Sequence, residues 1–375
     1  MKKYIWQKEN WPDFRCELPE KLIKSLSRCR RLQGELLYRL TDLGPDLLKE
    51  AQERLLVYEA ERTSQIEGVE VNSESIRSSA AKKLGLDRGG LKKPGLYEEG
   101  VVEMLFDATS NYNSPLTEKR LFQWHAGLFP LDHERLGNIA ACCFRRPEND
   151  PMQIISGRVD RPVVNFEAPS ADQIPMEIKR FIDWFQKSRN EIDGLMRAAI
   201  SHLWFITIHP FEDGNGRIAR AINDLAMSQD DDISIRAYSL SSQIQSSKKE
   251  KNDYYDILEK TQKGDGIIDD WVEWFAGLVE RSIKSSKEIL KFTLAKAEFW
   301  KKFSEVQINE RQRKVINRLL DSGQDGFEGG LNNKKYVGIA KVSRQTASRE
   351  LKDLLDKGLL HTEGQGKSTR YYIKY

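Results

Sequence analysis

Thirteen residues from Ile208 to Arg220, IHPFEDGNGRIAR, bring together a histidine, two acids, two glycines around an asparagine, and two arginines. Pro210 disfavours helical geometry at the residue before it, so a helix that ends at Ile208 leaves His209 at the edge of a helical bundle. A histidine in that place can accept the proton of an attacking hydroxyl, which contributes roughly 10² to 10⁴ in rate. The stretch therefore predicts a proton-transfer site.

Gly214, Asn215 and Gly216 open a second helix, whose first backbone N–H groups have no acceptor within the helix. Glycine lets a ligand approach the backbone closely, and the helix dipole favours a negative guest, so the pattern predicts an anion site. Arg217 and Arg220 are three residues apart, and we expect both on one helical face above this site, where they hold further phosphate oxygens. This density of donors indicates a polyphosphate.

Asp213 precedes the glycines and offers the hard carboxylate oxygen that Mg²⁺ prefers. In that position it can hold a magnesium ion that bridges phosphates. The anion site and the metal would then stabilise charge in the transition state while His209 removes a proton.

Helical patterns surround this stretch, and they must position it. We expect helices over 18–40, 45–67, 172–187 and 194–208, the second running from Pro45 to a stop at Gly68. The helix at 194–208 is apolar nearly all round, which is typical of the centre of a bundle. Met152–Ser156 and Val163–Phe166 are β-prone runs bracketed by turn residues and predict a hairpin, and 85–95 predicts a loop or linker.

The C-terminal part has a different pattern. Helices are expected at 309–320 and 335–342, and a third begins at Ser343 as N-cap and stops at Gly358, before two strands. This order predicts a winged helix-turn-helix. Residues 301–375 carry 16 Lys and Arg against 9 Asp and Glu, within a net charge of +3 for the whole chain, so this end is a candidate nucleic-acid surface.

Composition indicates a folded, helix-rich globular protein, with 39% hydrophobic and 31% charged residues among 375. That length predicts two or three domains. We expect a cytoplasmic protein without a membrane segment, because no apolar run nears the roughly 18 residues that span a bilayer and the first residues lack a signal-peptide core. Four cysteines show no metal-ligand spacing and are interpreted as reduced packing residues: Cys16, Cys29, Cys142 and Cys143.

HPFEDGNGR followed by Ile218, Ala219 and Arg220 resembles the Fic motif HxFx[DE]GNGRxxR at every fixed position. The resemblance implies a mainly α fold, a helical bundle with a β-hairpin flap, and transfer of AMP from ATP to a hydroxyl side chain of a target protein. It makes His209 the general base, Phe211 a packing residue and Asp213 the Mg²⁺ ligand. Gly214, Asn215 and Gly216 become the anion site, and Arg217 and Arg220 the phosphate clamps.

The same resemblance assigns residues outside the motif. Ile155, Ser156, Gly157 and Arg158 correspond to the flap that aligns the target's backbone by strand addition. NDYYDILEKTQKGD is similar to the family's Tyr-Tyr segment beside the adenine, which makes pocket residues of Tyr254 and Tyr255. Gln262 stands where some relatives have Asn.

TSQIEG, from Thr63 to Gly68, fits the inhibitory pattern [ST]xxxE[GN] of N-terminally inhibited Fic proteins. Thr63 and Glu67 are four apart and share a helical face, so the carboxylate can be aimed at a cationic pocket. The resemblance makes Arg220 its partner. In that pairing Arg220 cannot hold the γ-phosphate, and ATP binds in a pose unfit for in-line attack.

Other residues are interpreted as structural. GQGKST imitates a P-loop, but the first glycine of that motif would be at His361, and RYYIK after it predicts a strand instead of a helix. His125, His133 and His202 show no ligand spacing, and His202 is expected in the core. Trp271 and Trp274 are expected to pack, although one could adjoin the adenine.

These observations predict three domains: 1–95 with the inhibitory helix at about 45–68, a Fic core at 96–292 and a winged helix-turn-helix at 293–375. The function expected is that of an autoinhibited protein adenylyltransferase which uses MgATP on a Ser, Thr or Tyr hydroxyl, with self-modification and a homodimer as further expectations. The alternatives are a DNA-binding regulator whose Fic core senses a nucleotide, and a scaffold that removes AMP or transfers another phosphate-linked group.

Overall fold

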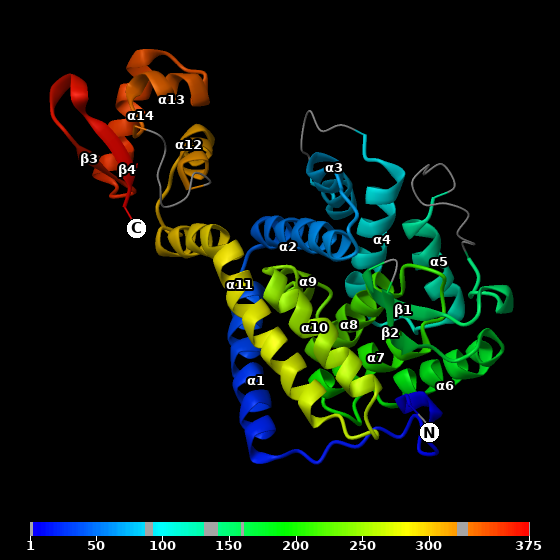
Figure 1. Ribbon diagram of the computed structural model, residues 1–375. Helices are drawn as coiled ribbons and strands as arrows, with labels where there is room; N and C mark the ends of the chain where they lie inside the picture. Colours follow the sequence, from blue (N-terminus) through cyan, green and yellow to red (C-terminus); the bar gives the residue numbers. More distant parts are fainter. Residues whose placement is uncertain (1–2, 87–92, 131–141, 159–160, 321–328, 375) are drawn as a thin grey trace. The chain divides into compact units, whose positions relative to one another are not determined.

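The structure is a computed structural model that describes residues 3–86, 93–130, 142–158, 161–320 and 329–374. As the sequence predicts, it is mainly helical with small antiparallel sheets (Figure 1). It forms two compact units, one of residues 1–38 and 52–286, the other of residues 39–51 and 287–375. Three helices contribute to both units: α1 (Glu20–Thr41), α2 (Pro45–Ile66) and α11 (Asp269–Lys302).

The unit boundaries differ from the domain boundaries expected at 95 and 292. Residues on both sides of 95 belong to the first unit, because α3 (Ser73–Leu84) packs against α4 (Leu96–Ser110). Residue 292 lies inside α11, which continues without a break. Helical hydrogen bonds are local, so one helix can serve two cores. Within the loop expected at 85–95, residues 87–92 lie outside the described residues.

The first unit is built around α7 (Gly194–Ile208) and α8 (Asn215–Asp231), which pack on each other. Every residue of α7 except Met196 is buried, which confirms the expected central helix. The other helices that complete this unit are α5 (Glu118–Leu128), α6 (Ile174–Lys187), α9 (Leu240–Ile244) and α10 (Lys248–Gln262), with the short 3-10 helices Ile5–Gln7, Pro147–Asn149 and Ala171–Gln173.

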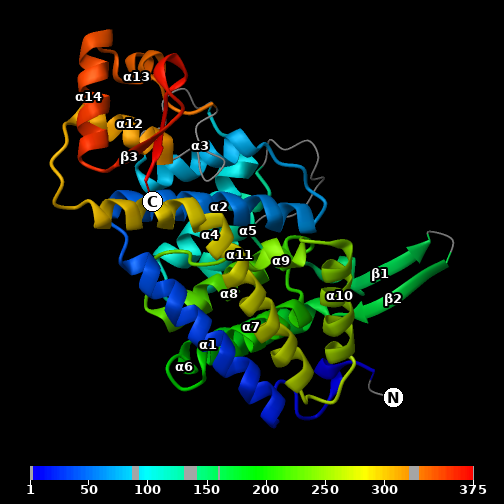
Figure 2. The same ribbon diagram turned by 90° about the vertical axis from the view of Figure 1, so that its left-hand side faces the viewer.

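The predicted hairpin is present as β1 (Gln153–Arg158) and β2 (Arg161–Glu167), with a register shift between Ile154 and Ile155. Figure 2 shows this hairpin extending away from the helices beside α10. Side chains at its outer part, such as Ile155 and Val163, are more than half exposed. The hairpin therefore presents apolar side chains outward, with its base held by the bundle.

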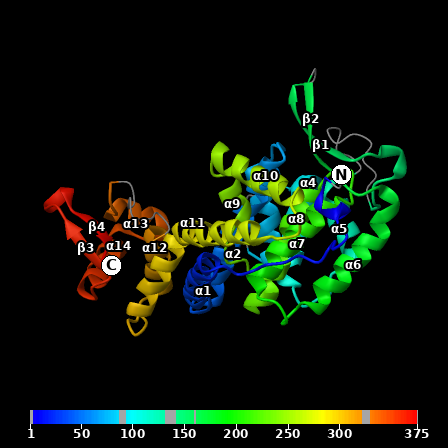
Figure 3. The ribbon, with the colours of Figure 1, turned by 60° about the horizontal axis from the view of Figure 1, so that its bottom comes forward.

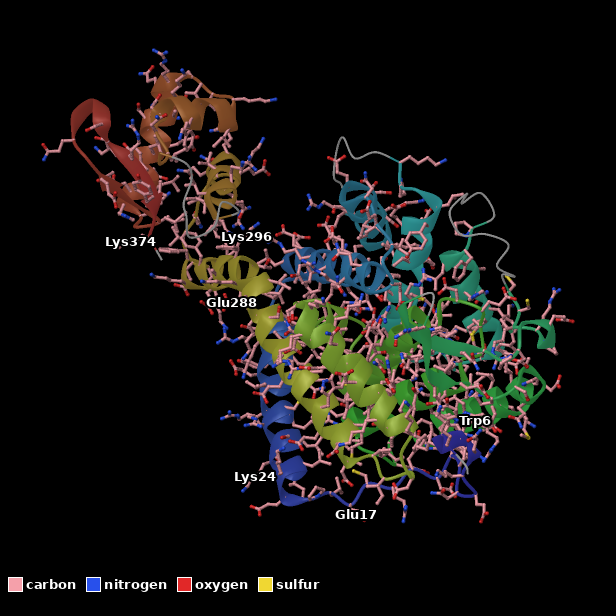
Figure 4. The ribbon with its side chains drawn as sticks, in the orientation of Figure 1. Trp6, Glu17, Lys24, Glu288, Lys296 and Lys374 are labelled. Carbon is pink, nitrogen blue, oxygen red and sulfur yellow. The ribbon has the colours of Figure 1, made fainter. Side chains whose placement is uncertain are left out.

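The N-terminal arm packs at the base of the hairpin (Figure 3). Tyr4 contacts the ring of Phe166 edge-on at 5.1 Å between ring centroids. Trp6, labelled in Figure 4, donates its indole N–H to the carbonyl oxygen of Glu167 at 2.7 Å. The arm thus anchors the end of β2 to the first unit.

The second unit contains the C-terminal elements in the predicted order. They are α12 (Glu310–Leu320), α13 (Asn333–Ala340), α14 (Arg344–Asp356), β3 (Leu360–Glu363), the 3-10 helix Gly366–Ser368 and β4 (Arg370–Ile373). Ser343 caps α14 by accepting from the backbone N–H of Thr346, and Gly358 has a positive φ of 74°, as expected for a stop. Residues Arg370 to Ile373 form a strand, so the P-loop imitation is not followed by a helix. Among the residues that the structure describes, none of the helices could span a membrane.

Candidate functional site

The connection between α7 and α8 is held in one conformation by its own side chains. Asn215 accepts from the backbone N–H of Phe211 at 3.0 Å and donates its amide to the Phe211 carbonyl at 2.8 Å. The Phe211 ring is fully buried and stacks on His125 at 4.2 Å, so it packs as expected. His125 in turn donates from Nε2 to the Asp213 carbonyl at 3.2 Å, because a carbonyl can only accept. The loop is therefore held by hydrogen bonds from Asn215 and His125 and by the packing of Phe211.

His209 ends α7 in a left-handed backbone conformation, with φ 51° and ψ 58°. Its ring Nδ1 lies 3.2 Å from the carbonyl oxygen of Ile206. Since that oxygen can only accept, Nδ1 carries the proton and Nε2 keeps its lone pair. Burial, together with the charge of Arg145, lowers the pKa of His209 to about 4. The ring is therefore neutral at pH 7 and able to accept a proton.

The start of α8 offers free backbone donors. Ile218 N–H bonds to the Gly214 carbonyl, whereas the N–H groups of Asn215, Gly216 and Arg217 have no acceptor among the described residues. Gly214 has a φ of 85°, and a Cβ there would lie 2.9 Å from the Phe129 ring, so a glycine is required. These three N–H groups are the free donors that the sequence pattern predicts at the start of α8.

The carboxylate of Glu67, the residue after α2, already lies against these N–H groups. Arg220 donates from Nη2 to Glu67 Oε1 at 2.6 Å, and the ion pair expected from the sequence is present. Thr63 accepts from Arg220 through its hydroxyl at 2.8 Å and its carbonyl at 3.0 Å. A Cβ built on Gly216 would overlap with Glu67 Oε1, which places the carboxylate directly over the first turn of α8.

The charge of Glu67 is favoured by its surroundings. Burial by itself would raise the pKa of Glu67, but the positive charges of Arg220, Arg217 and Lys251 outweigh it and hold the pKa below its usual value. Lys251 also donates to the Ile66 carbonyl at 2.5 Å, at the C-terminal end of α2. Glu67 is therefore ionised at neutral pH and paired with a fully buried arginine.

Arg217 is placed differently from the expectation that both arginines lie above the anion site. Its side chain, 1% exposed, donates to the Tyr97 hydroxyl at 3.2 Å and lies over the Phe129 ring at 5.1 Å. Nη2 is 3.4 Å from Asp213 Oδ1. The structure corrects the predicted placement because α4 and the end of α5 offer this guanidinium an aromatic and hydroxyl site away from the cavity.

A cavity of about 680 Å³ opens beside His209. It is enclosed by β1 and β2, the α7–α8 connection, α10 and the end of α2. The sequence-predicted residues that line it are Glu67, Ile155, Ser156, His209, Asp213, Asn215, Gly216, Arg220, Tyr254, Tyr255 and Gln262. Thr63, Gly214 and Arg217 are not among the described residues that line it, and the backbones of Gly157 and Arg158 pair with Pro162 and Arg161 in the hairpin.

The two tyrosines of α10 differ in exposure. Tyr254 is buried and bonds through its hydroxyl to His202 Nε2 at 2.9 Å, while Asn223 Nδ2 lies 3.0 Å from His202 Nδ1. The Asn223 amide donates, so His202 Nε2 carries the proton and donates to Tyr254. Tyr255 is 42% exposed at the cavity mouth. Gln262 donates to the Thr207 hydroxyl at 3.2 Å, which fixes its side chain in the cavity wall.

Residues expected to be structural lie in the core. Burial lowers the pKa of His125 to about 4 and that of His202 to about 3, so both are neutral. Trp271 and Trp274 stack at 5.3 Å, and neither lines the cavity. Within the described ranges there is no group of three or more His, Cys, Asp or Glu that could hold a metal by itself, and His133 lies outside those ranges.

Sequence reasoning missed several polar residues of the cavity wall and the anchorage of α2. Gln153, Asn165, Glu212 and Asn252 also line the cavity. Glu59, one turn before Thr63, is buried and accepts from the hydroxyls of Ser239 (2.5 Å) and Ser241. The sequence could have indicated Glu59, because Glu59, Thr63 and Glu67 are each four residues apart and such spacing puts side chains on one helical face.

Residues 115–227 match the Fic/DOC family, and residues 4–86 match a domain of unknown function (DUF4172). The chain is similar to protein adenylyltransferase fic-1 of Caenorhabditis elegans, with 37% identity over 82 residues, which are 21% of this chain and 16% of that protein. It is also similar to protein adenylyltransferase Fic of Nematostella vectensis, with 31% identity over 117 residues, 31% of this chain and 25% of that one.

A solved structure shares the fold. The crystal structure of a Fic family protein from Desulfovibrio desulfuricans G20 matches with a TM-score of 0.56 and 17% identity, over 95% of this chain and 96% of that one. At this identity the likeness shows the fold alone. Helical bundle, hairpin and HPFEDGNGR loop together define a Fic domain. Residues 115–227 thus carry a Fic domain, and the matched stretches cover well under half the length of the curated relatives named above.

Proposed function

We propose that this chain is an autoinhibited protein adenylyltransferase that transfers AMP from ATP to a Ser, Thr or Tyr hydroxyl of a target protein and of itself. One observation carries the proposal. A neutral His209 lines one cavity with Asn215 and Gly216 at the start of α8, and a carboxylate ion-paired to Arg220 lies against Gly216 in the same cavity. A general base beside a phosphate site is the arrangement that nucleotidyl transfer requires. The curated relatives named as protein adenylyltransferases support the reaction class.

The chemistry follows from the position of each group. The target hydroxyl oxygen forms a bond to the α-phosphorus, the bond between that phosphorus and the bridging oxygen breaks, and pyrophosphate leaves. His209 Nε2 takes the hydroxyl proton, since Nδ1 is committed to Ile206. The N–H groups of Asn215, Gly216 and Arg217 stabilise the negative charge on the phosphates.

Asp213 is the residue that fits a magnesium ion. Its side chain is half exposed at the cavity, and one carboxylate together with substrate phosphates is a usual way for proteins to hold Mg²⁺. When bound there, the ion would neutralise phosphate charge. One oxygen of Asp213 accepts from Gly214 N–H at 2.5 Å, which orients the carboxylate before the ion arrives.

Inhibition is proposed to act through Arg220. Its guanidinium binds Thr63 through Nε and Nη2 and Glu67 through Nη2, so a γ-phosphate would have to compete with Glu67 for this arginine. The carboxylate over Gly216 would also repel a phosphate from the first turn of α8. Release of α2 would remove Glu67, and both the Arg220 guanidinium and the first turn of α8 would then be open to phosphate. The hairpin is proposed to align the target by strand addition; a homodimer and a cytoplasmic location remain parts of this proposal.

A labelling experiment with the Glu67→Gly chain and Mg²⁺ tests the reaction. We expect label from α-labelled ATP to become covalently attached to the protein, and none from γ-labelled ATP, because AMP is the group transferred. Autoradiography after denaturing electrophoresis measures both. Label from the γ-position would identify a phosphotransferase. Absence of both labels would favour the nucleotide-sensor alternative, and loss of label from a pre-modified chain would identify removal of AMP.

The second unit supports a second function, because its exposed charge is positive on one helix. One acidic residue of α14 turns inward, since Glu350 is buried and bonds Arg311 at 2.6 Å and Tyr336 at 2.7 Å, whereas Asp356 at the end of the helix is exposed. Basic and polar residues of the same helix are exposed, namely Arg344, Gln345, Ser348, Arg349 and Lys352. We infer that this unit is a winged helix-turn-helix that docks α14 in the major groove of DNA.

The DNA-binding proposal predicts salt-sensitive binding to duplex DNA. Replacing both Arg344 and Arg349 by alanine should weaken binding at least about tenfold and flatten the dependence of log Kd on log salt concentration, because fewer counterions are released. Fluorescence anisotropy with a labelled duplex measures this. The exposed Lys314 of α12 serves as a control, since Lys314→Ala removes one charge outside α14. Equal weakening by Lys314→Ala, or binding insensitive to salt, would contradict the proposal.

A further inference from the structure

Arg145 links the connection between α7 and α8 to the hairpin. No motif in the sequence points to this residue. Its side chain is completely buried. The backbone N–H donates to the Pro210 carbonyl at 2.9 Å, and Nε donates to the His209 carbonyl at 2.9 Å. Two consecutive carbonyls of the loop are therefore held by one residue.

The other donors of the same guanidinium go to the two ends of the hairpin. Nη1 pairs with the carboxylate of Asp150, just before β1, and Nη2 donates to the carbonyl of Pro169, just after β2. The second oxygen of Asp150 accepts from Ala171 N–H at 2.7 Å, at the entry to α6. The Arg145 guanidinium thus connects the α7–α8 loop to both ends of the hairpin, and Asp150 extends this connection to the entry of α6.

Arginine suits this position because its rigid fork can donate in several directions at once, whereas lysine offers a single point charge. A buried cation is costly unless it is paired and fully hydrogen-bonded, and here Nε, Nη1 and Nη2 all have acceptors. Burial lowers the pKa of Arg145, and the charge of Asp150 opposes that shift. The His209 carbonyl, the Asp150 carboxylate and the Pro169 carbonyl are therefore all held by Arg145.

Arg145 bonds to a residue whose backbone conformation is unfavourable. His209 has a positive φ of 51°, which is uncommon for a residue with a Cβ. The bond from Arg145 to the His209 carbonyl fixes that peptide, and with it the direction of the imidazole. A shift of about 1 Å at a reacting group can cost about 10²-fold in rate.

We propose that Arg145 is a positioning residue that sets His209 relative to the hairpin, so that a hydroxyl on a chain docked along β1 meets Nε2. This inference rests on the proposed adenylyltransferase function. Arg145 does not line the cavity and so acts through His209, not on the nucleotide. Its loss should therefore reduce the rate of transfer while nucleotide binding persists.

The test uses the full chain with Glu67→Gly as parent. We expect Arg145→Gln to lower kcat for self-labelling about 100-fold while the KM for ATP changes less than about threefold. Arg145→Lys should recover part of the rate. Arg146→Gln is the matched control, since its neighbour Arg146 is exposed, and it should equal the parent. A kcat within threefold of the parent, or a rise of KM in step with the lost rate, would overturn the proposal.

Two further measurements keep the test decisive. If Arg145→Gln fails to fold, Asp150→Asn removes the paired charge with little change of shape and should lower kcat about tenfold at unchanged KM; an unchanged kcat overturns the inference. If the parent is inactive, the adenylyltransferase proposal fails separately, and hydrogen exchange becomes the readout. Exchange should then rise together in 150–169 and 209–216 for Arg145→Gln but not Arg146→Gln, and a rise in only one segment overturns the link.

Discussion

His209→Ala in the Glu67→Gly chain is expected to abolish AMP transfer while ATP still binds. The expected loss is about 10² to 10⁴ in kcat, because no other described residue of the cavity is a neutral histidine that could replace the base. ATP affinity should stay within about threefold, because the free N–H groups and Arg220 are untouched. Self-labelling rates and calorimetric ATP binding measure the two effects. His361→Ala, at a half-exposed histidine of β3, is the control.

The same base sets the pH dependence. A base must be unprotonated to work, and the pKa of His209 lies at about 4, below its ordinary value. In the Glu67→Gly chain the rate should therefore be flat from about pH 6 to 8 and should fall as the pH drops toward 4. A rate that halves near pH 6.5 would show that His209 is not desolvated in the working enzyme. Substantial labelling by His209→Ala would remove it from the mechanism.

Glu67→Gly is expected to raise self-labelling about 10- to 100-fold over the unmodified chain, which corresponds to a coupling of a few kcal/mol. The substitution removes the carboxylate that pairs with Arg220 and that lies over Gly216. Glu67→Gln should give a smaller increase, since the amide can still accept from Arg220 but carries no charge. Initial rates with α-labelled ATP measure these differences. The exposed Glu70 provides the control Glu70→Ala.

The thermal stability of the Glu67→Gly chain should fall, although its labelling rate should rise. Removing Glu67 leaves the buried Arg220 without its ionic partner, so the melting temperature should fall. ATP should then stabilise the Glu67→Gly chain more than the unmodified chain, because phosphate can pair with the freed guanidinium. Equal labelling rates for both chains, with equal stabilisation by ATP, would refute inhibition through this pair.

Local patterns predicted the elements around the site well. Pro210 ends α7 at Ile208, Pro45 begins α2, and Ser343 caps α14, each as expected. Such signals depend on a few neighbouring residues: a fixed φ, a missing N–H or a capping hydroxyl. The spacing of Thr63 and Glu67 likewise determines a shared face on any helix.

The tertiary structure decided which groups meet. Arg217 turns to Tyr97 and Phe129, although its spacing from Arg220 suggested a shared face above the anion site. Arg145 reaches Pro169 and His209 because packing brings the hairpin ends to the loop. A residue's type and spacing determine what it can donate or accept and where it lies on its own helix. Its partner depends on long-range packing, because only the folded chain decides which of several competing acceptors lies within hydrogen-bonding distance and which burial costs are offset.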